Sequence, residues 1–183
     1  MDEHRLGLKP ITGRVWARPG PEGAVQSKTP IGERPVVTVE HRYEWLYVYA
    51  FACPEQGLAH FWIVPEVNTV AMNLVLAAFA KDSGASKEKA VLLVWDQAGY
   101  HIAHHLKVPE GVILVFLPSR SPELQPAEHL WKHTDIPLKN QHFLSLEHLE
   151  NTLAPHLAWL ETQSELLRKD LLFHWWPRTI VHL

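Results

Sequence analysis

The apolar residues of the chain fall into short runs that predict β-strands. Residues 43–53 and 58–64 are rich in aromatic and β-branched side chains, and a turn at residues 54–57 separates them, which predicts an antiparallel hairpin. Two later runs, residues 90–96 and 111–117, are almost continuously apolar. Such runs are typical of strands buried on both faces, as in the middle of a sheet covered by helices.

Capping residues and helical periodicity predict helices between and after these strands. Asn68 is a good N-cap for a helix that runs to about Ser83, and Gly84 is placed to end it. A short helix is expected over residues 101–106. These two helices would connect the hairpin to the later strands.

The last helical region contains a proline. Ser145 is expected to cap a helix, and Pro155 should kink or restart it before the apolar stripe continues through Leu160 and Leu167. The complete order is hairpin, helix, strand, short helix, strand and helices. This order predicts an α/β fold with a mixed sheet and helices on both faces.

Length and composition predict one soluble domain. The 183 residues could bury about 70% of their unfolded surface, and 46% of them are hydrophobic. No apolar run approaches the roughly 20 residues needed to cross a bilayer, no leader is recognisable, and Cys53 is the single cysteine. A cytoplasmic location fits best. Residues 9–42 are expected to form a long loop or irregular hairpin.

The charge balance is a poor match for a chain whose main task is to hold nucleic acid. Twenty acidic residues against seventeen basic ones give a net charge of −3, whereas nucleic-acid-binding domains are usually basic. Any contact with DNA must therefore be local, or be completed by another segment.

The segment LPSRSPELQPAEHLW, residues 117–131, links a strand to the start of a helix after Pro126. Its three prolines restrict the backbone more than an ordinary surface loop requires. The segment also holds two carboxylates, Glu123 and Glu128. Taken alone, each is most simply a first-turn residue, where the helix dipole favours negative charge.

Asp96 ends the predicted strand 90–96, and ligands tend to bind at the carboxyl ends of strands in α/β sheets. Taken alone, Asp96 is most simply a turn residue. Together with Glu128, however, it would place two carboxylates at one end of the sheet. Converging carboxylates are hard ligands suited to Mg²⁺ or Mn²⁺, and phosphoryl transfer uses such a site with two ions about 4 Å apart.

A cluster of histidines raises a different hypothesis, a zinc hydrolase. His101, His104 and His105 form an H-x-x-H-H pattern in a chain with thirteen histidines. The pattern lacks the glutamate that accompanies a helical histidine pair in zinc proteases. A surface helix with incidental histidines is the simpler interpretation.

Several segments together resemble the catalytic domain of insertion-sequence transposases in the mariner-related superfamily of DDE (Asp, Asp, Glu) enzymes. The strongest match is the proline-bracketed SPELQPAEHLW, and the next is Asp96 followed by QAGYH. The resemblance covers nearly the whole chain and is carried by DEHRLGLKPITGRVWARPG at 2–20, YEWLYVYAFACPEQG at 43–57, LLVWDQAGYH at 92–101, LPSRSPELQPAEHLW at 117–131 and HWWP at 174–177.

The resemblance implies a ribonuclease H-like fold, a five-stranded mixed sheet flanked by helices, as a single DDE catalytic domain over residues 1–183. It implies that Asp2, Asp96 and Glu128 are the catalytic residues and metal ligands, with Glu128 rather than Glu123 as the third. Such enzymes use two Mg²⁺ or Mn²⁺ ions to hydrolyse a phosphodiester at the transposon end. They then drive the freed 3′-hydroxyl into double-stranded target DNA, typically at a TA dinucleotide.

Four further residues are candidates for supporting roles. His101, which follows DQAGY, would approach the phosphate or orient Asp96. Arg120, in the proline-rich loop, is a candidate phosphate contact, and Arg14 and Arg18 are candidate DNA contacts. Ordinary surface charge is the simpler interpretation of each arginine taken alone.

Two departures from the family pattern shape the expected activity. Only Met1 precedes Asp2, so the first strand is expected to be truncated, and the N-terminal helix-turn-helix region that recognises transposon ends is expected to be absent. The chain would then be one product of a split reading frame or a degenerate fragment, and would act as a homodimer or with a separate N-terminal DNA-binding segment, without a membrane. The alternative is a catalytically impaired remnant that acts as an interaction or regulatory module.

Overall fold

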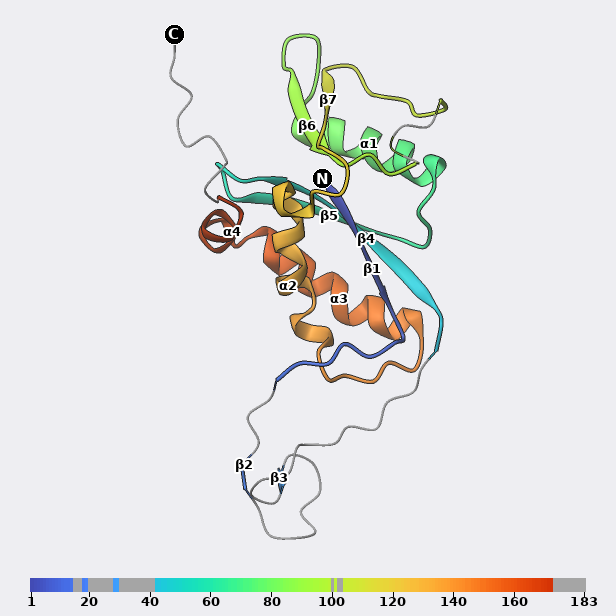
Figure 1. Cartoon of the computed structure of the whole chain (residues 1–183), viewed down its shortest axis with the longest axis vertical. Coiled ribbons are helices and arrows are strands. Elements are labelled where there is room, and N and C mark those ends of the chain that lie inside the picture. Colours follow the sequence, from blue (N-terminus) through green and yellow to red (C-terminus); the bar gives the residue numbers. More distant parts are fainter. Residues whose placement is uncertain (15–17, 20–27, 30–41, 100, 102–103, 173–183) are drawn as a thin grey trace.

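The computed structural model describes residues 1–14, 18–19, 28–29, 42–99, 101 and 104–172, and they form a mixed α/β structure (Figure 1). Most of the predicted loop 9–42 lies outside the described residues. The strands are β1 (Asp2–Gly7), β2 (Arg18–Pro19), β3 (Lys28–Thr29), β4 (Trp45–Cys53), β5 (Leu58–Val64), β6 (Val91–Trp95) and β7 (Val112–Phe116). The helices are α1 (Thr69–Ser83), α2 (Trp131–Thr134), α3 (Leu146–Glu161) and α4 (Ser164–Leu171), with 3₁₀ segments η1 (Pro122–Leu124), η2 (Pro126–Leu130) and η3 (Ile136–Leu138).

The five longer strands form two hydrogen-bonded groups. Strands β1, β4 and β5 make an antiparallel sheet in that order, which confirms the predicted hairpin, and β6 and β7 make a parallel pair. Within the described chain no ladder joins β1 to β6. The two strands meet where the Met1 amino group donates a hydrogen bond of 2.6 Å to the Val94 carbonyl. The single five-stranded mixed sheet that the resemblance implies is thus divided, in the described residues, into a three-stranded group and a two-stranded group.

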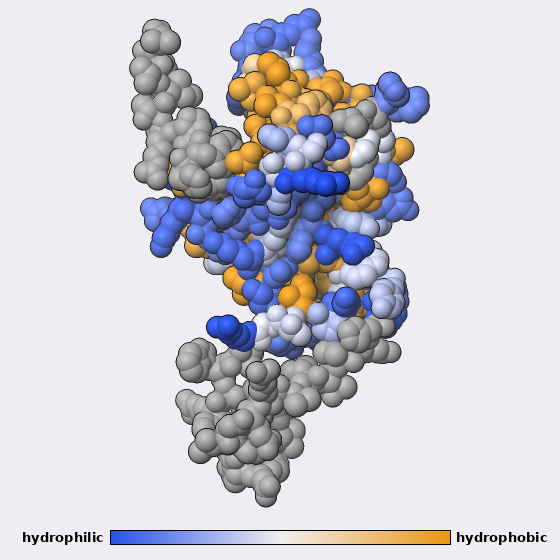
Figure 2. All heavy atoms as spheres, in the orientation of Figure 1, coloured by the Kyte–Doolittle hydropathy of each residue, from blue (hydrophilic) through white to orange (hydrophobic). Residues whose placement is uncertain are grey.

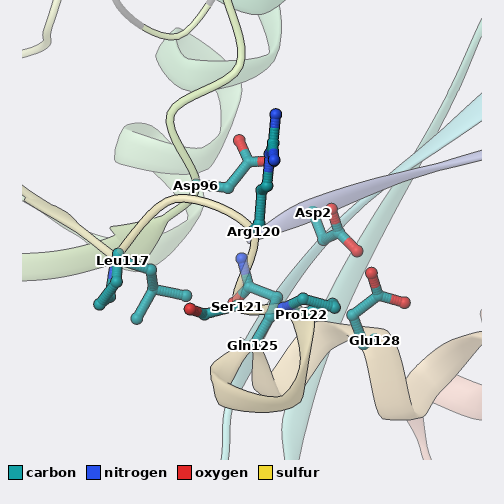
Figure 3. A pocket seen from close by; sticks show the side chains of 9 residues that line it. Asp2, Asp96, Leu117, Arg120, Ser121, Pro122, Gln125 and Glu128 are labelled. Atoms are coloured by element: carbon teal, nitrogen blue, oxygen red, sulfur yellow. The ribbon is translucent and has the colours of Figure 1, made fainter.

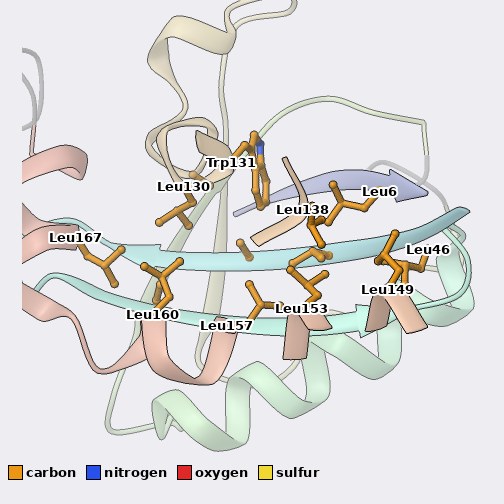
Figure 4. Close-up of a cluster of buried hydrophobic side chains, with 14 of the residues drawn as sticks. Leu6, Leu46, Leu130, Trp131, Leu138, Leu149, Leu153, Leu157, Leu160 and Leu167 are labelled. Carbon is orange, nitrogen blue, oxygen red and sulfur yellow. The ribbon is translucent and has the colours of Figure 1, made fainter. Parts of the chain in front are cut away.

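Helices cover both faces of the three-stranded sheet. Successive side chains of β4 point to opposite faces, so they contribute to two separate cores. One face carries Val48 and Ala50 and packs against η2, α3 and α4; we call this the α3-side core (Figure 4). The opposite face carries Tyr49 and Phe51 and packs against α1 and β6; we call this the α1-side core. Their largest fully buried members include Leu6, Leu130, Leu138, Leu149, Leu153, Leu160, Leu167 and Leu171 on the first side and Tyr49, Met72, Leu76 and Trp95 on the second.

Helix α1 begins and ends where the sequence predicts. The Asn68 side chain accepts a hydrogen bond of 2.8 Å from the Ala71 amide, so one of the unpaired donors of the first turn is satisfied. Gly84 has φ of 69°, a left-handed conformation that glycine adopts without a steric penalty, and its amide bonds to carbonyls of the last turn.

Replacing Asn68 by alanine is expected to lower the free energy of unfolding by about 1 kcal/mol, because the Ala71 amide loses its acceptor. Urea denaturation followed by circular dichroism measures the change. Asn68→Ser is the matched control, since a serine oxygen can still cap the helix. Equal losses in the two variants would show that the cap is not the source of the effect.

The C-terminal helices differ from the prediction in two respects. Helix α3 continues through Pro155 and does not restart there, and Leu167 lies on a separate helix, α4. Proline has no backbone N–H, so the carbonyl of Asn151, four residues before Pro155, lacks its helical hydrogen-bond donor. Both residues are exposed. Water can therefore hydrate that carbonyl while Leu153, Leu157 and Leu160 keep the opposite side of the helix packed.

Strands β6 and β7 are buried on one face, not on both as their apolar sequences predict. Leu93 and Val112 belong to the α1-side core, whereas Leu92 is 66% exposed and Ile113 is 50% exposed. Figure 2 shows apolar atoms gathered over these strands. A continuous apolar run does not indicate which face of a strand is buried. In the described residues no element packs over the face that carries Leu92 and Ile113.

Two other local predictions need correction. The helix expected after Pro126 begins as the 3₁₀ segment η2 and becomes α-helical only at Trp131. The short helix expected over residues 101–106 lies partly outside the described residues, and the described His104 and His105 form a turn.

Candidate active site

A small pocket of about 90 Å³ lies where β1, the end of β6 and the proline-rich loop meet (Figure 3). Its lining includes the three carboxylates that the resemblance implies as metal ligands. Asp2 is the first residue of β1, Asp96 directly follows β6, and Glu128 lies within η2. The pocket is completed by Leu117, Pro118, Arg120, Ser121, Pro122 and Gln125.

Asp2 lies largely buried against a tryptophan and faces a second carboxylate. The Trp131 indole Nε1–H donates a hydrogen bond of 3.0 Å to Asp2 Oδ2, and the Glu128 side chain points toward Asp2 in Figure 3. Burial, followed by the charge of Glu128, raises the pKa of Asp2 from its ordinary value of 3.8 to about 7, although the indole hydrogen bond opposes this shift. A divalent cation beside Asp2 would oppose the repulsion.

Asp96 is held by a backbone amide and by a buried histidine. Its Oδ1 accepts a hydrogen bond of 2.9 Å from the Ala98 amide and lies 2.6 Å from His101 Nδ1. The other ring nitrogen of His101, Nε2, lies 2.8 Å from Glu3 Oε1. Burial alone would lower the pKa of His101, but the hydrogen bonds and charges of Glu3 and Asp96 outweigh it and raise the pKa.

The proline-rich loop is fixed to the strands by hydrogen bonds. Gln125 is buried and its Nε2 donates to the Met1 carbonyl at 2.6 Å, while Gln97 Nε2 donates to the Leu117 carbonyl at 2.8 Å. Arg120 has φ of 59°, which costs a non-glycine residue roughly 1 kcal/mol. These bonds and the prolines hold the loop beside β1, with Glu128 at the pocket.

The three carboxylates line the same pocket but do not form a cluster that could bind a metal ion in this arrangement. Within the part of the chain that the structure describes, no three His, Cys, Asp or Glu side chains lie close enough together to hold a metal ion. The donor chemistry nevertheless fits a hard divalent cation, since each side chain offers carboxylate oxygens.

Only some of the residues proposed for supporting roles lie at or beside the pocket in the described residues. Arg120 lines the pocket and His101 contacts Asp96. Arg14 is exposed and does not line the pocket, and the side chain of Arg18 lies outside the described residues. The zinc hypothesis gains no support, because His104 and His105 are exposed and each ring nitrogen of His101 contacts a carboxylate.

Sequence reasoning missed two residues that touch the candidate site. Glu3 contacts His101, and Trp131 contacts Asp2. Trp131 could have been found, because it lies one helical turn after Glu128 and so faces the same direction. Nothing in the sequence distinguishes Glu3 from an ordinary charged residue near a terminus.

Comparison with known proteins identifies the class. Residues 1–150 match the family described as DDE superfamily endonuclease, and the chain belongs to this family. The resemblance to the catalytic domain of DDE transposases is thereby confirmed. An uncharacterised protein of Sinorhizobium fredii, y4pE/y4sA, is 40% identical over 90 residues, which are 48% of this chain and 64% of that protein.

Solved structures of the Mos1 transposase show a similar fold. The Mos1 paired-end complex with the left transposon end has a TM-score of 0.59 at 18% identity and covers 93% of this chain and 49% of the Mos1 chain. The Mos1 paired-end complex with Mn has a TM-score of 0.56 at 16% identity, with 93% and 52% covered. The chain thus spans about half the length of these Mos1 chains.

Among the described residues, no helix combines the length and the apolarity that crossing a bilayer requires.

Proposed function

We propose that the chain is the catalytic domain of a DDE transposase, which cleaves DNA at transposon ends and joins the freed 3′-hydroxyl to target DNA. The observation that carries the proposal is the pocket to which β1, the end of β6 and η2 each contribute one carboxylate, Asp2, Asp96 and Glu128. Membership of the DDE superfamily endonucleases supports a role for the same three residues.

In this proposal Asp2, Asp96 and Glu128 hold two Mg²⁺ or Mn²⁺ ions. When bound, such ions activate the attacking oxygen and stabilise the leaving oxygen of a phosphodiester. The chain itself supplies orientation: Trp131 fixes Asp2 through its indole N–H, and η2 presents Glu128. Arg120, at the pocket lining, would contact a non-bridging phosphate oxygen.

Double-stranded DNA is the proposed partner. The Mos1 structures with a similar fold are a paired-end complex with a transposon end and a strand transfer complex, which supports this choice. The mildly acidic charge of the chain suggests that most of the DNA affinity comes from elsewhere. We therefore propose a homodimer, or an assembly with a separate N-terminal DNA-binding segment, and a TA target, with Arg14 and Arg18 as additional DNA contacts.

A second candidate function is a catalytically impaired remnant that associates with itself or with an active transposase. One observation favours it. In the described residues the three carboxylates line one pocket but do not form a metal-ligating cluster. An interaction module would keep the two packed cores and would not require the ions.

Nicking of supercoiled plasmid DNA separates the two functions. We expect the wild-type chain to nick the plasmid in Mn²⁺ and to stop when EDTA removes the metal. Asp96→Asn, purified identically, is expected to show only background, whereas Asp82→Asn, an exposed aspartate on α1, should behave as wild type. Equal activity in all three proteins, or none in any of them, would count against the enzyme.

A further inference from the structure

His101 connects β1, which carries Asp2, to Asp96, which directly follows β6. We propose that His101 is a positioning residue, which holds the Asp96 carboxylate in place by tying it to Glu3 on β1. The inference rests on the proposed function, since positioning matters only if Asp96 binds a metal ion.

The first support is the geometry of the ring. His101 Nδ1 lies 2.6 Å from Asp96 Oδ1 and Nε2 lies 2.8 Å from Glu3 Oε1, so one nitrogen contacts the carboxylate after β6 and the other a carboxylate on β1. Ionised carboxylates only accept hydrogen bonds. Both ring nitrogens therefore donate when both carboxylates are ionised, and charge-assisted bonds of this kind are the stronger ones.

The second support is that the ring cannot turn away from these partners. His101 is 1% exposed, and its ring stacks on the fully buried Trp95, with centroids 4.3 Å apart and planes inclined by 13°. Trp95 ends β6 and directly precedes Asp96. The indole thus fixes the plane of the imidazole, and the two carboxylates fix its rotation.

The third support is that the ring links β1 to the end of β6, two strands that lie in separate hydrogen-bonded groups in the described residues. Asp2 lies on β1 and Asp96 follows β6; within the described residues no ladder pairs these two strands, and the Met1 amino group donates a hydrogen bond to the Val94 carbonyl of β6. Glu3 adjoins Asp2 and, by strand alternation, points to the opposite face. The contact between Glu3 and His101 therefore fixes the backbone that carries Asp2 and the side chain of Asp96 together.

Removing the link is expected to weaken metal binding more than folding. In His101→Ala and Glu3→Ala, the concentration of Mn²⁺ that gives half-maximal nicking should rise about 10-fold or more, the usual effect of losing a group that orients a metal ligand. Glu3→Gln keeps an amide oxygen that can accept from the ring, and it should restore a value within a few-fold of wild type. Mn²⁺ binding followed by electron paramagnetic resonance should give the same order without DNA.

His133→Ala is the matched control. His133 also bonds a carboxylate, with Nε2 2.5 Å from Asp170 Oδ2, but neither residue lines the pocket. Its loss should change the melting temperature without changing the Mn²⁺ requirement. If His101→Ala behaves in the same way, with lower stability and an unchanged Mn²⁺ requirement, His101 is a structural residue and the proposal is wrong.

A measurement without metal tests the link separately from the proposed function. Glu3→Ala and Asp96→Ala should alter the stability to urea non-additively in the wild-type background, and additively once His101 is alanine. Additive effects in both backgrounds would overturn the link, whatever the activity. If the wild-type chain neither binds Mn²⁺ nor nicks DNA, the proposed function fails, and His101 then has no metal ligand to position even if the non-additivity is found.

Discussion

Replacing Glu128 by glutamine is expected to reduce Mn²⁺-dependent nicking by more than about 100-fold, the consequence of losing a charged ligand from a metal site. Glu123→Gln is the matched control. It lies five residues earlier in the same proline-rich loop, is exposed, and does not line the pocket. Plasmid nicking by the two variants compares the same chemical change at two neighbouring positions, and equal losses would contradict the assignment of Glu128.

The same substitution should leave the fold intact, and the electrostatics at Asp2 give the reason. The pKa of Asp2 is raised from 3.8 to about 7 by burial and by the Glu128 charge, so its ionisation destabilises the metal-free fold as pH rises from 3.8 through 7. Glutamine removes the repulsive charge. Above pH 7 the metal-free Glu128→Gln protein should therefore melt no lower than wild type. A large fall in melting temperature would attribute the lost activity to misfolding.

Local signals in the sequence predicted the elements that depend on neighbouring residues. The hairpin β4–β5 and the limits of α1 follow from alternation, a turn and two caps, all within a few residues of the structure they specify. Asp96 and Glu128 line one pocket, and their sequence positions, after a strand and after Pro126, indicate why they can meet; their role as metal ligands stays a prediction.

The contacts that the sequence could not predict join residues far apart in the chain. Glu3 and His101 are 98 positions apart, and Asp2 and Trp131 are 129 positions apart. No periodicity links such pairs, because their approach depends on how the sheet and the proline-rich loop pack. The exposed face of β6 and β7 was also beyond prediction from the sequence. An apolar strand can be buried, but its sequence does not indicate which element will cover it.

Packing of η2 explains why Glu128, rather than Glu123, reaches the pocket. A 3₁₀ helix has about three residues per turn, so residues three apart share a face. Ala127 and Leu130 are three apart and fully buried in the α3-side core, which turns the intervening Glu128 toward the pocket. The earlier segment η1, which contains Glu123, has no buried residue to orient it.

Leu130→Ala is therefore expected to damage both the fold and the site. Leu130 is 0% exposed and lies beside Trp131 in the α3-side core (Figure 4). Its truncation should cost about 3 kcal/mol, the lost burial plus the cavity left behind, and lower the melting temperature by roughly 6 to 12 °C. Calorimetry measures the change. The Mn²⁺ requirement for nicking should rise as well, because η2 loses the contact that orients Glu128.

Leu144→Ala provides the comparison at an exposed leucine, 69% accessible, where the same truncation should change stability by less than about 0.5 kcal/mol. If Leu130→Ala were equally mild, η2 would not be anchored through its apolar side, and the orientation of Glu128 would need another cause. If instead Leu130→Ala melted lower but kept the wild-type Mn²⁺ requirement, the loop's prolines and the Gln125 hydrogen bond to Met1 would be sufficient to hold Glu128.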